Sequence, residues 1–374
     1  TIAPGTGNVT FSGGGVGSTT SLTSITVNPG GSRIFTGAVT SQTLTIFGGT
    51  VEFNAPATIG SGVFISGTLQ GSGDVTFTQP LTWIGGDMRG TGRTIIGPTG
   101  SLVIAGAGVK RAFRTIDSSG VVFWTDGDVQ FASTGGGAPV GSFINRGTFY
   151  MQSPGHFIGT AANASFSNLG FIERSGPGAS SLTDLVITSA GQIAVTDGTL
   201  NLTPRSGLFT NQGTLDLASA GTLAITGSFA QVPDAQLFTV LAGPGAGQAG
   251  RITVTGTAAL AGQLTVALAP GFVPTIGTSF DVVSASSIIG TFATVFLPPN
   301  SASSRVALSY PGNAARLSVL DLADFNGDGV VDPDDLADFI SAYFSTPPGL
   351  GTDFNGDGNV DPDDLADFIT AFFT

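Results

Sequence analysis

The phrase Asn-Arg-Gly-Thr-Phe-Tyr at residues 145–150 returns three times, in degenerate form, along the middle of the chain. The copies are Asn-Leu-Gly-Phe-Ile-Glu at 168–173, Ala-Gly-Gln-Ile-Ala-Val at 190–195 and Asn-Gln-Gly-Thr-Leu-Asp at 211–216. Their glycines, Gly147, Gly170, Gly191 and Gly213, follow one another at nearly constant intervals. A repeat of about twenty residues with short apolar stretches and Gly/Asn corners is typical of a β-solenoid, in which each coil stacks on the next.

Alternating apolar residues along the chain also predict short strands separated by turns. The pairs that show the alternation are Leu44/Ile46, Val51/Phe53, Val121/Phe123, Leu215/Leu217 and Leu223/Ile225. This texture resembles the Gly/Thr-rich passenger domains of autotransporter-type surface proteins, which implies a mainly β fold built as a parallel β-helix. A Gly/Thr-rich array of β-sandwiches would produce a similar sequence pattern and is the alternative fold.

Changes of texture along the chain indicate three regions. We expect a β-solenoid over 1–230, a β-rich capping region over 231–317 and a separate C-terminal module over 318–374. Longer apolar runs between Pro- and Gly-rich turns begin near Ala230. A cap is needed there because the last coil of a solenoid would otherwise expose an open sheet edge.

The C-terminal region contains one motif twice. Residues 324–335 read Asp-Phe-Asn-Gly-Asp-Gly-Val-Val-Asp-Pro-Asp-Asp, and residues 353–364 repeat this with one change. The identity continues beyond the motif, through most of 336–344 and 365–373. Oxygen-bearing side chains stand at loop positions 1, 3, 5, 9 and 12, with glycine at position 6. This spacing predicts two EF-hand-type loops, each binding one Ca²⁺ ion.

The spacing assigns a ligand set to each loop. In the first loop Asp324, Asn326 and Asp328 bind through side chains, Val330 through its carbonyl, Asp332 through water, and Asp335 closes the shell. The corresponding residues of the second loop are Asp353, Asn355, Asp357, Asn359 (backbone), Asp361 and Asp364. Both loops end in Asp, whereas the usual pattern ends in a bidentate Glu.

A helix is predicted after each loop. Asp332 and Asp361 occupy N-cap positions, and Pro333 and Pro362 follow at the first helical position, where proline loses no hydrogen bond. Apolar residues then recur at helical spacing in both copies, so we expect the two helices to pack on each other.

The duplicated loop, its terminal Asp and the single helix after each loop resemble the dockerin family of secreted bacterial proteins, in particular planctomycete-type tails. The resemblance covers residues 320–374. It implies a small helical module that docks onto a cohesin module of another protein. Positions 10 and 11 of the loops, Pro333-Asp334 and Pro362-Asp363, differ from the common Ser-Thr type of that family.

Charge is concentrated in this module. The chain has 25 acidic and 12 basic residues, a net charge of −13, and residues 321–374 hold about half of the acidic residues and no Lys or Arg. Such a tail repels itself until cations neutralise it, so we expect calcium to drive its folding. The sequence has no basic patch for nucleic acid and no apolar run long enough to span a membrane.

Residues with catalytic chemistry are sparse. His156 is the only histidine and Lys110 the only lysine. We interpret Asp126 and Asp128 as a turn between strands and His156 as a loop residue. Lys110, Arg111 and Arg114 are interpreted as a solvated rim, and Trp83 and Trp124 as core or corner residues.

These observations favour a secreted, non-enzymatic structural or adhesive protein of the cell surface. We take the start at Thr1 to indicate a mature product whose signal peptide has been removed. The C-terminal module would couple the rod to another protein, either by head-to-tail self-association into a fibre or layer or through a cohesin-like partner. Glycan binding stays open. The alternative is a dockerin-bearing β-helix polysaccharide lyase or glycosidase tethered to a cohesin-like scaffold.

Overall fold

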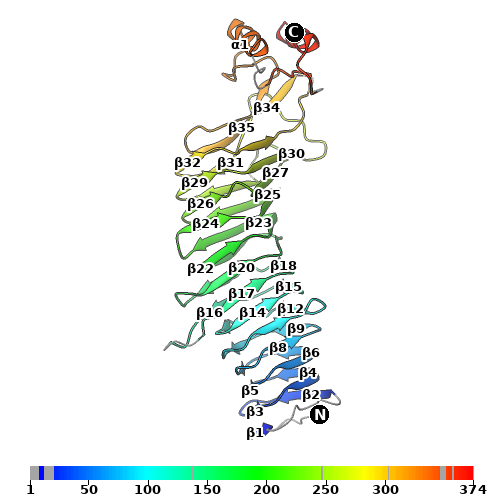
Figure 1. Ribbon diagram of the computed structural model, residues 1–374, viewed down its shortest axis with the longest axis vertical. Helices are drawn as coiled ribbons and strands as arrows, with labels where there is room; N and C mark the ends of the chain where they lie inside the picture. Colours follow the sequence, from blue (N-terminus) through cyan, green and yellow to red (C-terminus); the bar gives the residue numbers. More distant parts are fainter. Residues whose placement is uncertain are drawn as a thin grey trace.

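The repeated phrase forms equivalent parts of successive coils in a parallel β-solenoid, which confirms the predicted fold. The computed structural model describes residues 8–11, 21–135, 139–245, 247–301, 303–345, 351–355 and 358–373. The coils stack along one long axis, with the N-terminal strands at one end and the two helices at the other (Figure 1). The solenoid is therefore a rod that carries the C-terminal module on its end.

Strands of successive coils lie in three columns, and neighbours in a column pair in parallel. The first column contains β1 (Asn8–Phe11), β3 (Ser32–Phe35), β5 (Thr50–Phe53), β7 (Thr68–Gln70), β10 (Gly86–Met88), β13 (Lys110–Ala112), β16 (Val129–Phe131), β19 (His156–Gly159), β22 (Ala179–Ser189), β23 (Gln192–Pro204), β25 (Thr214–Ile225), β28 (Arg251–Val254) and β31 (Ser279–Ser284).

The second column begins with the first halves of β4 (Val39–Ile46) and β6 (Ala57–Phe64). It continues through β8 (Val75–Phe77), β11 (Thr94–Ile96), β14 (Thr115–Ser118), β17 (Ser142–Asn145), β20 (Ser165–Asn168), the end of β22, β24 (Leu208–Asn211), β26 (Ser228–Gln231), β29 (Thr257–Leu260) and β32 (Ser287–Gly290).

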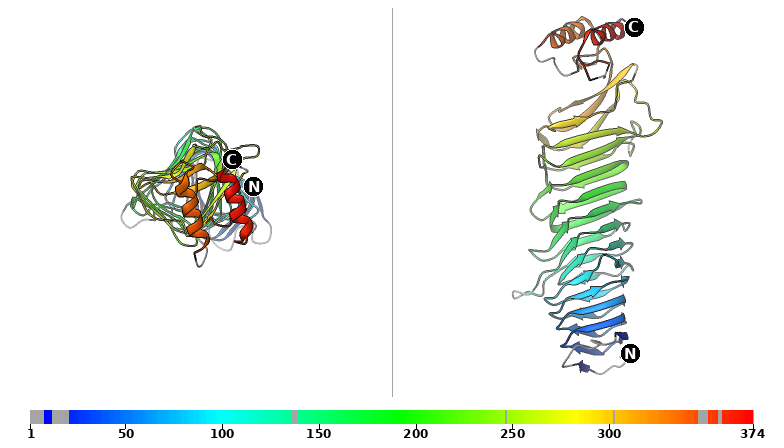
Figure 2. Two further views of the ribbon diagram at one scale, coloured as in Figure 1. Left: turned by 90° about the horizontal axis from the view of Figure 1, so that it is seen from above. Right: turned by 45° about the vertical axis from the view of Figure 1, so that its right-hand side comes forward.

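The third column begins with β2 (Leu22–Val27) and the second halves of β4 and β6. It continues through β9 (Leu81–Trp83), β12 (Ser101–Ile104), β15 (Val121–Trp124), β18 (Thr148–Met151), β21 (Phe171–Arg174), the first halves of β23 and β25, β27 (Gln236–Leu241), β30 (Gln263–Leu268) and β33 (Thr294–Phe296). Seen from above, the columns surround a common interior (Figure 2).

The coils differ in length. Arg33 lies opposite Val51 near the N-terminal end, whereas Ile252 lies opposite Val283 near the other end. The second interval is much the longer, so the nearly constant spacing of the repeated phrase describes only the middle of the rod. Elsewhere the connections between strands are shorter or longer while the strands keep their stacking partners.

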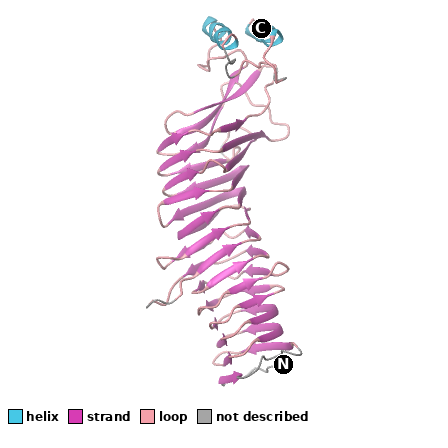
Figure 3. Cartoon of the chain, viewed as in Figure 1, coloured by secondary structure: helices cyan, strands magenta, loops and turns pink. Residues whose placement is uncertain are grey.

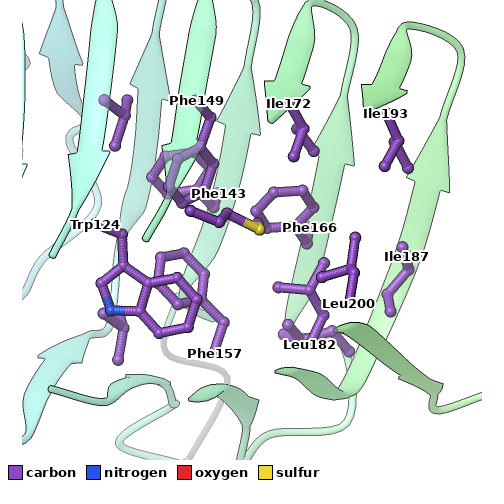
Figure 4. Close-up of a cluster of buried hydrophobic side chains, with 14 of the residues drawn as sticks. Trp124, Phe143, Phe149, Phe157, Phe166, Ile172, Leu182, Ile187, Ile193 and Leu200 are labelled. Atoms are coloured by element: carbon purple, nitrogen blue, oxygen red, sulfur yellow. The ribbon is translucent and has the colours of Figure 1, made fainter. Parts of the chain in front are cut away.

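Alternate side chains of each strand fill the interior. Most of the predicted pairs, such as Leu44/Ile46 and Leu215/Leu217, are buried there. In the aromatic section of the core, Phe143 and Phe166 stack with ring centroids 5.5 Å apart (Figure 4). Trp83 and Trp124 are fully buried, as the core interpretation expected.

Val121 and Phe123 share a face, as predicted, but that face is the outer one. Val122 and Trp124 point inward instead and are fully buried. On the outside, the Phe123 ring stacks on Tyr150 of the next coil, with centroids 5.3 Å apart. Both faces of β15 are thus apolar, and the face that carries Trp124 is the one that packs into the interior.

The repeated glycines form a corner ladder along the rod. A Cβ atom on Gly170 would lie 2.2 Å from the carbonyl oxygen of Gly147, and one on Gly191 would lie 2.0 Å from that of Gly170. Gly213 stands in the same relation to Gly191, at 2.1 Å. These positions require glycine because the backbone of one coil lies directly against the next, which explains the repeated phrase.

An asparagine ladder runs beside the glycines. The buried Asn145 donates through Nδ2 to Asn168 Oδ1 (2.9 Å) and to the Phe171 carbonyl (3.0 Å). Asn168 donates in the same way to Ser189 Oγ and to the Gln192 carbonyl, both at 3.1 Å. These bonds satisfy the buried Nδ2 donors of both asparagines where the chain turns from the second column into the third.

The C-terminal end of the solenoid is closed by antiparallel strands. β34 (Ser304–Ser309) pairs with β35 (Ala314–Asp321), and β35 pairs with β31. Parallel stacking does not change at residue 231, where the sequence suggested that the cap begins, but continues to β33. The longer apolar runs after Ala230 thus belong to coils, and the antiparallel closure involves only β31, β34 and β35 among the described strands.

Within the described residues two helices follow the antiparallel closure, α1 (Pro333–Tyr343) and α2 (Pro362–Phe372), and they are drawn in Figure 3. Asp332 and Asp361 are their N-caps and a proline opens each helix, as predicted. Within the described residues, neither helix has the length and hydropathy that crossing a bilayer requires.

Replacing Gly170 with Ala tests the corner ladder. We expect the free energy of unfolding to fall by about 1–3 kcal/mol, because the new methyl group overlaps the Gly147 carbonyl and forces the coils apart. Gly108→Ala is the matched control, since a Cβ at Gly108 meets no atom within 4 Å. Denaturant unfolding measures both variants, and equal stabilities would contradict the ladder.

Candidate functional site

The C-terminal module is held together by a small aromatic core between its two helices. Phe339 of α1 and Phe368 of α2 stack face to face, with ring centroids 4.0 Å apart and planes inclined by 2°. Phe325 and Phe354, which follow the first residue of each loop, pack edge-on against this pair. The predicted packing of the two helices on each other is therefore confirmed, and the two halves contribute equivalent residues.

The first loop is organised by two buried carboxylates at its ends. Asp324 accepts hydrogen bonds from the amides of Gly327 (2.8 Å) and Gly329 (3.0 Å). Asp335 accepts from the amides of Asn326 and Asp332, both at 2.9 Å. Both carboxylates are almost completely buried. The two residues therefore fold the loop back on itself, and Asp335 also joins it to the start of α1.

The second loop uses the corresponding residues. Asp364 is fully buried and accepts from the amides of Phe354 (2.7 Å), Asn355 (3.1 Å) and Asp361 (2.8 Å). Burial opposes ionisation of this carboxyl group, but the backbone amides outweigh it and lower its pKa. Asp353 accepts from the Gly358 amide at 2.9 Å.

The other expected calcium ligands lie along the loops. The side-chain oxygens of Asn326, Asp328 and Asp332 each accept a backbone amide two positions further on. Asp361 accepts the amide of Asp363 at 2.9 Å. Val330 and Asn359 are exposed, and Asp357 lies outside the described residues.

The structure does not show a calcium-binding geometry. Among the described residues, no group of three or more His, Asp or Glu side chains comes together closely enough to hold a metal ion. The EF-hand-type loops and their ligand set therefore remain a prediction.

Several features of the described loops nevertheless fit a cation. The Oδ1 atom of Asp353 is buried and has no hydrogen-bond partner in the described part of the chain. An isolated buried carboxylate oxygen is costly, and a cation would satisfy it. Gly329 and Gly358, at position 6, have φ values of 93° and 92°, which favour glycine. The side-chain donors are all oxygen atoms, which calcium prefers.

The module contacts the end of the rod through Arg305 of β34. Its guanidinium group donates to the carbonyls of Asp324 and Phe325. Burial lowers the pKa of Arg305, and the negative charges of Asp324 and Asp335 oppose this shift. The amide of Leu322 donates to the Ser303 carbonyl at 3.1 Å, which adds a second link. Nothing in the local sequence of Arg305 marks it as a contact to the module, so this role was not predicted.

Both helices also expose an apolar pair at the same positions. Ile340 and Phe344 at the end of α1 are 39% and 71% exposed, and Ile369 and Phe373 at the end of α2 are 39% and 75% exposed. We call these residues the apolar pairs. The recurrence of apolar residues one helical turn apart in both copies was the sequence signal for this surface.

Two of the three residues expected on a solvated rim are buried, so that expectation is wrong for them. The Lys110 ammonium group is fully buried and donates to the carbonyls of Gly106 (2.6 Å) and Gly108 (2.9 Å). Burial lowers its pKa, which the charges of Asp126 and Asp128 oppose. Arg114 donates to the backbone carbonyls of Gly73, Arg89 and Arg93 in preceding coils, and burial lowers its pKa to about 10. These side chains satisfy carbonyl oxygens at the corners of the coils.

The remaining polar candidates also have structural partners. Arg111 lies 3.7 Å from Asp87. Asp126 and Asp128 form the predicted turn and accept the amides of Gly127 and His156. His156 is the exposed first residue of β19, and not a loop residue as expected.

No protein-family model matches this chain, and no curated protein is significantly similar to it. The site is therefore interpreted from its own geometry.

Replacing Asp364 with Ala tests its role in the second loop. The change leaves three backbone amides without their acceptor, at about 1–3 kcal/mol for each buried group, so we expect α2 to unfold locally. Asp367→Ala is the control because Asp367 is exposed on the same helix. Amide hydrogen exchange in residues 358–373 measures the effect, and native protection in Asp364→Ala would contradict it.

Proposed function

We propose that this protein is a secreted structural or adhesive component of a cell surface, which assembles through its C-terminal module. The proposal rests on one observation above all, the duplicated apolar pairs at the far end of a stiff rod. Exposed apolar clusters of this kind mark sites of protein association. Their position at the end of the long axis favours a contact that extends the rod.

Calcium is the proposed control of this contact. Each dockerin-like loop would hold one ion through the six residues assigned to it by spacing, and the ion would neutralise carboxylates that otherwise repel one another. Because a site of this kind is incomplete in the unfolded chain, the binding free energy contributes to folding of the module. The apolar pairs lie toward the ends of the helices that follow the loops, so their arrangement depends on the same folding step.

The partner in this proposal is another copy of the chain. A module at one end that binds a different surface of the next copy makes a heterologous contact, which does not close on itself and grows into a filament or layer. A cohesin-like protein is the alternative partner of the same surface. It would produce complexes of defined size instead of growing assemblies.

Electron microscopy of the purified protein, with millimolar calcium and with excess chelator, tests assembly. We expect filaments or sheets with calcium and separate rods with chelator. Separate rods under both conditions would contradict self-assembly and leave a separate protein as the partner to be sought.

Polar substitution of the apolar pairs tests the contact itself. The double variant Phe344→Ser and Phe373→Ser removes the most exposed rings of the module, so we expect assembly to be lost while calcium binding remains. Phe47→Ser is the matched control, because Phe47 is 47% exposed on the solenoid, away from the module. Light scattering measures assembly, and an unchanged signal in the double variant would assign the contact to another surface.

A further inference from the structure

The two loops are nearly identical in sequence but not in surroundings. Arg305 is the one basic side chain with a described hydrogen bond to the module. It donates to the carbonyls of Asp324 and Phe325, the first two residues of the first loop. The sequence provides no Lys or Arg after Arg316. A positive charge from the cap therefore supports one half of a module that has none of its own.

This charge acts on the first loop. The described carboxylates whose fields act on the guanidinium group are Asp324 and Asp335, at positions 1 and 12 of that loop. Asp353 and Arg305 both line a pocket of about 180 Å³, but no hydrogen bond or ion pair joins them within the described residues. The second loop instead contains the buried Asp353 Oδ1 atom without a described partner.

We propose that Arg305 is the resident cation of the first loop, so that calcium controls the module mainly through the second loop. The proposal concerns a positioning residue and rests on the calcium binding proposed above. In the first loop, Arg305 replaces part of the charge neutralisation that an ion would supply. In the described part of the second loop no basic side chain does this, so an ion would supply the neutralisation.

Two consequences follow from elementary electrostatics. The guanidinium group repels a divalent ion near Asp324 and Asp335, so the first loop binds calcium more weakly than the second, on the order of tenfold for a +2 and a +1 charge about 6 Å apart with the dielectric constant of water. The hydrogen bonds of Arg305 also anchor the first loop to β34. The first half therefore stays on the cap without calcium, and the second half becomes ordered when calcium binds.

Calorimetric titration of the full chain with CaCl₂ tests whether the two loops differ in calcium affinity. We expect two binding steps separated on the order of tenfold in affinity. Asn326→Ala and Asn355→Ala, the same substitution at position 3 of each loop, assign the steps. Asn355→Ala should weaken the tight step and Asn326→Ala the weak one. The reverse assignment, or two equal steps, would overturn the proposal while leaving calcium binding intact.

Substitution of Arg305 tests whether its charge causes the difference in calcium affinity between the two loops. Arg305→Gln removes the charge but keeps an amide donor, so the weak step should tighten on the order of tenfold and the tight step should stay unchanged. Arg305→Lys keeps the charge and should keep two unequal steps. An Arg305→Gln titration identical to that of the unmodified chain would overturn the proposal. Absence of any calcium heat in the unmodified chain would overturn both this proposal and the calcium binding beneath it.

Discussion

The structure depends on the parallel stacking of one coil on the next. Each strand obtains its main-chain partners from the coils before and after it, and each coil completes its part of the core only against its neighbours. Every corner must therefore allow two backbones to come close together. Gly147, Gly170, Gly191 and Gly213 meet this requirement by lacking a side chain. Asn145 and Asn168 donate hydrogen bonds to residues of the following coil, so their buried side-chain amides have partners inside the rod.

The same constraint explains the buried cations. The carbonyls of a corner point in several directions and cannot all find amide partners. Lys110 and Arg114 extend into such corners and donate to several carbonyls at once. Arg305 extends this arrangement to the junction, where the carbonyls belong to the first residues of the C-terminal module. One type of contact thus serves both the interior of the rod and its connection to the module.

The sequence predicted much of this fold because the stacking constraint is local and repeated. Glycine spacing indicated the solenoid, and the N-cap Asp and first-turn Pro located both helices. Other features depend on partners far apart in the sequence. The inward direction of Trp124 was not evident because both faces of β15 are apolar. The continuation of coils to Phe296 was hidden because those coils are longer. The roles of Lys110, Arg114 and Arg305 were not evident because their partners are backbone carbonyls, which every residue type has. The acidic loops were evident in the sequence, whereas the described residues do not show the ligand geometry that their spacing predicts.

We propose that calcium orders an end module on a rod that is already formed. Hydrogen–deuterium exchange of the whole chain, compared with millimolar calcium and with chelator, tests it most directly. We expect calcium to slow exchange only in peptides that follow residue 320, while the coils from β3 to β33 exchange equally in both conditions. Unchanged exchange in the module, or a change along the whole rod, would contradict it.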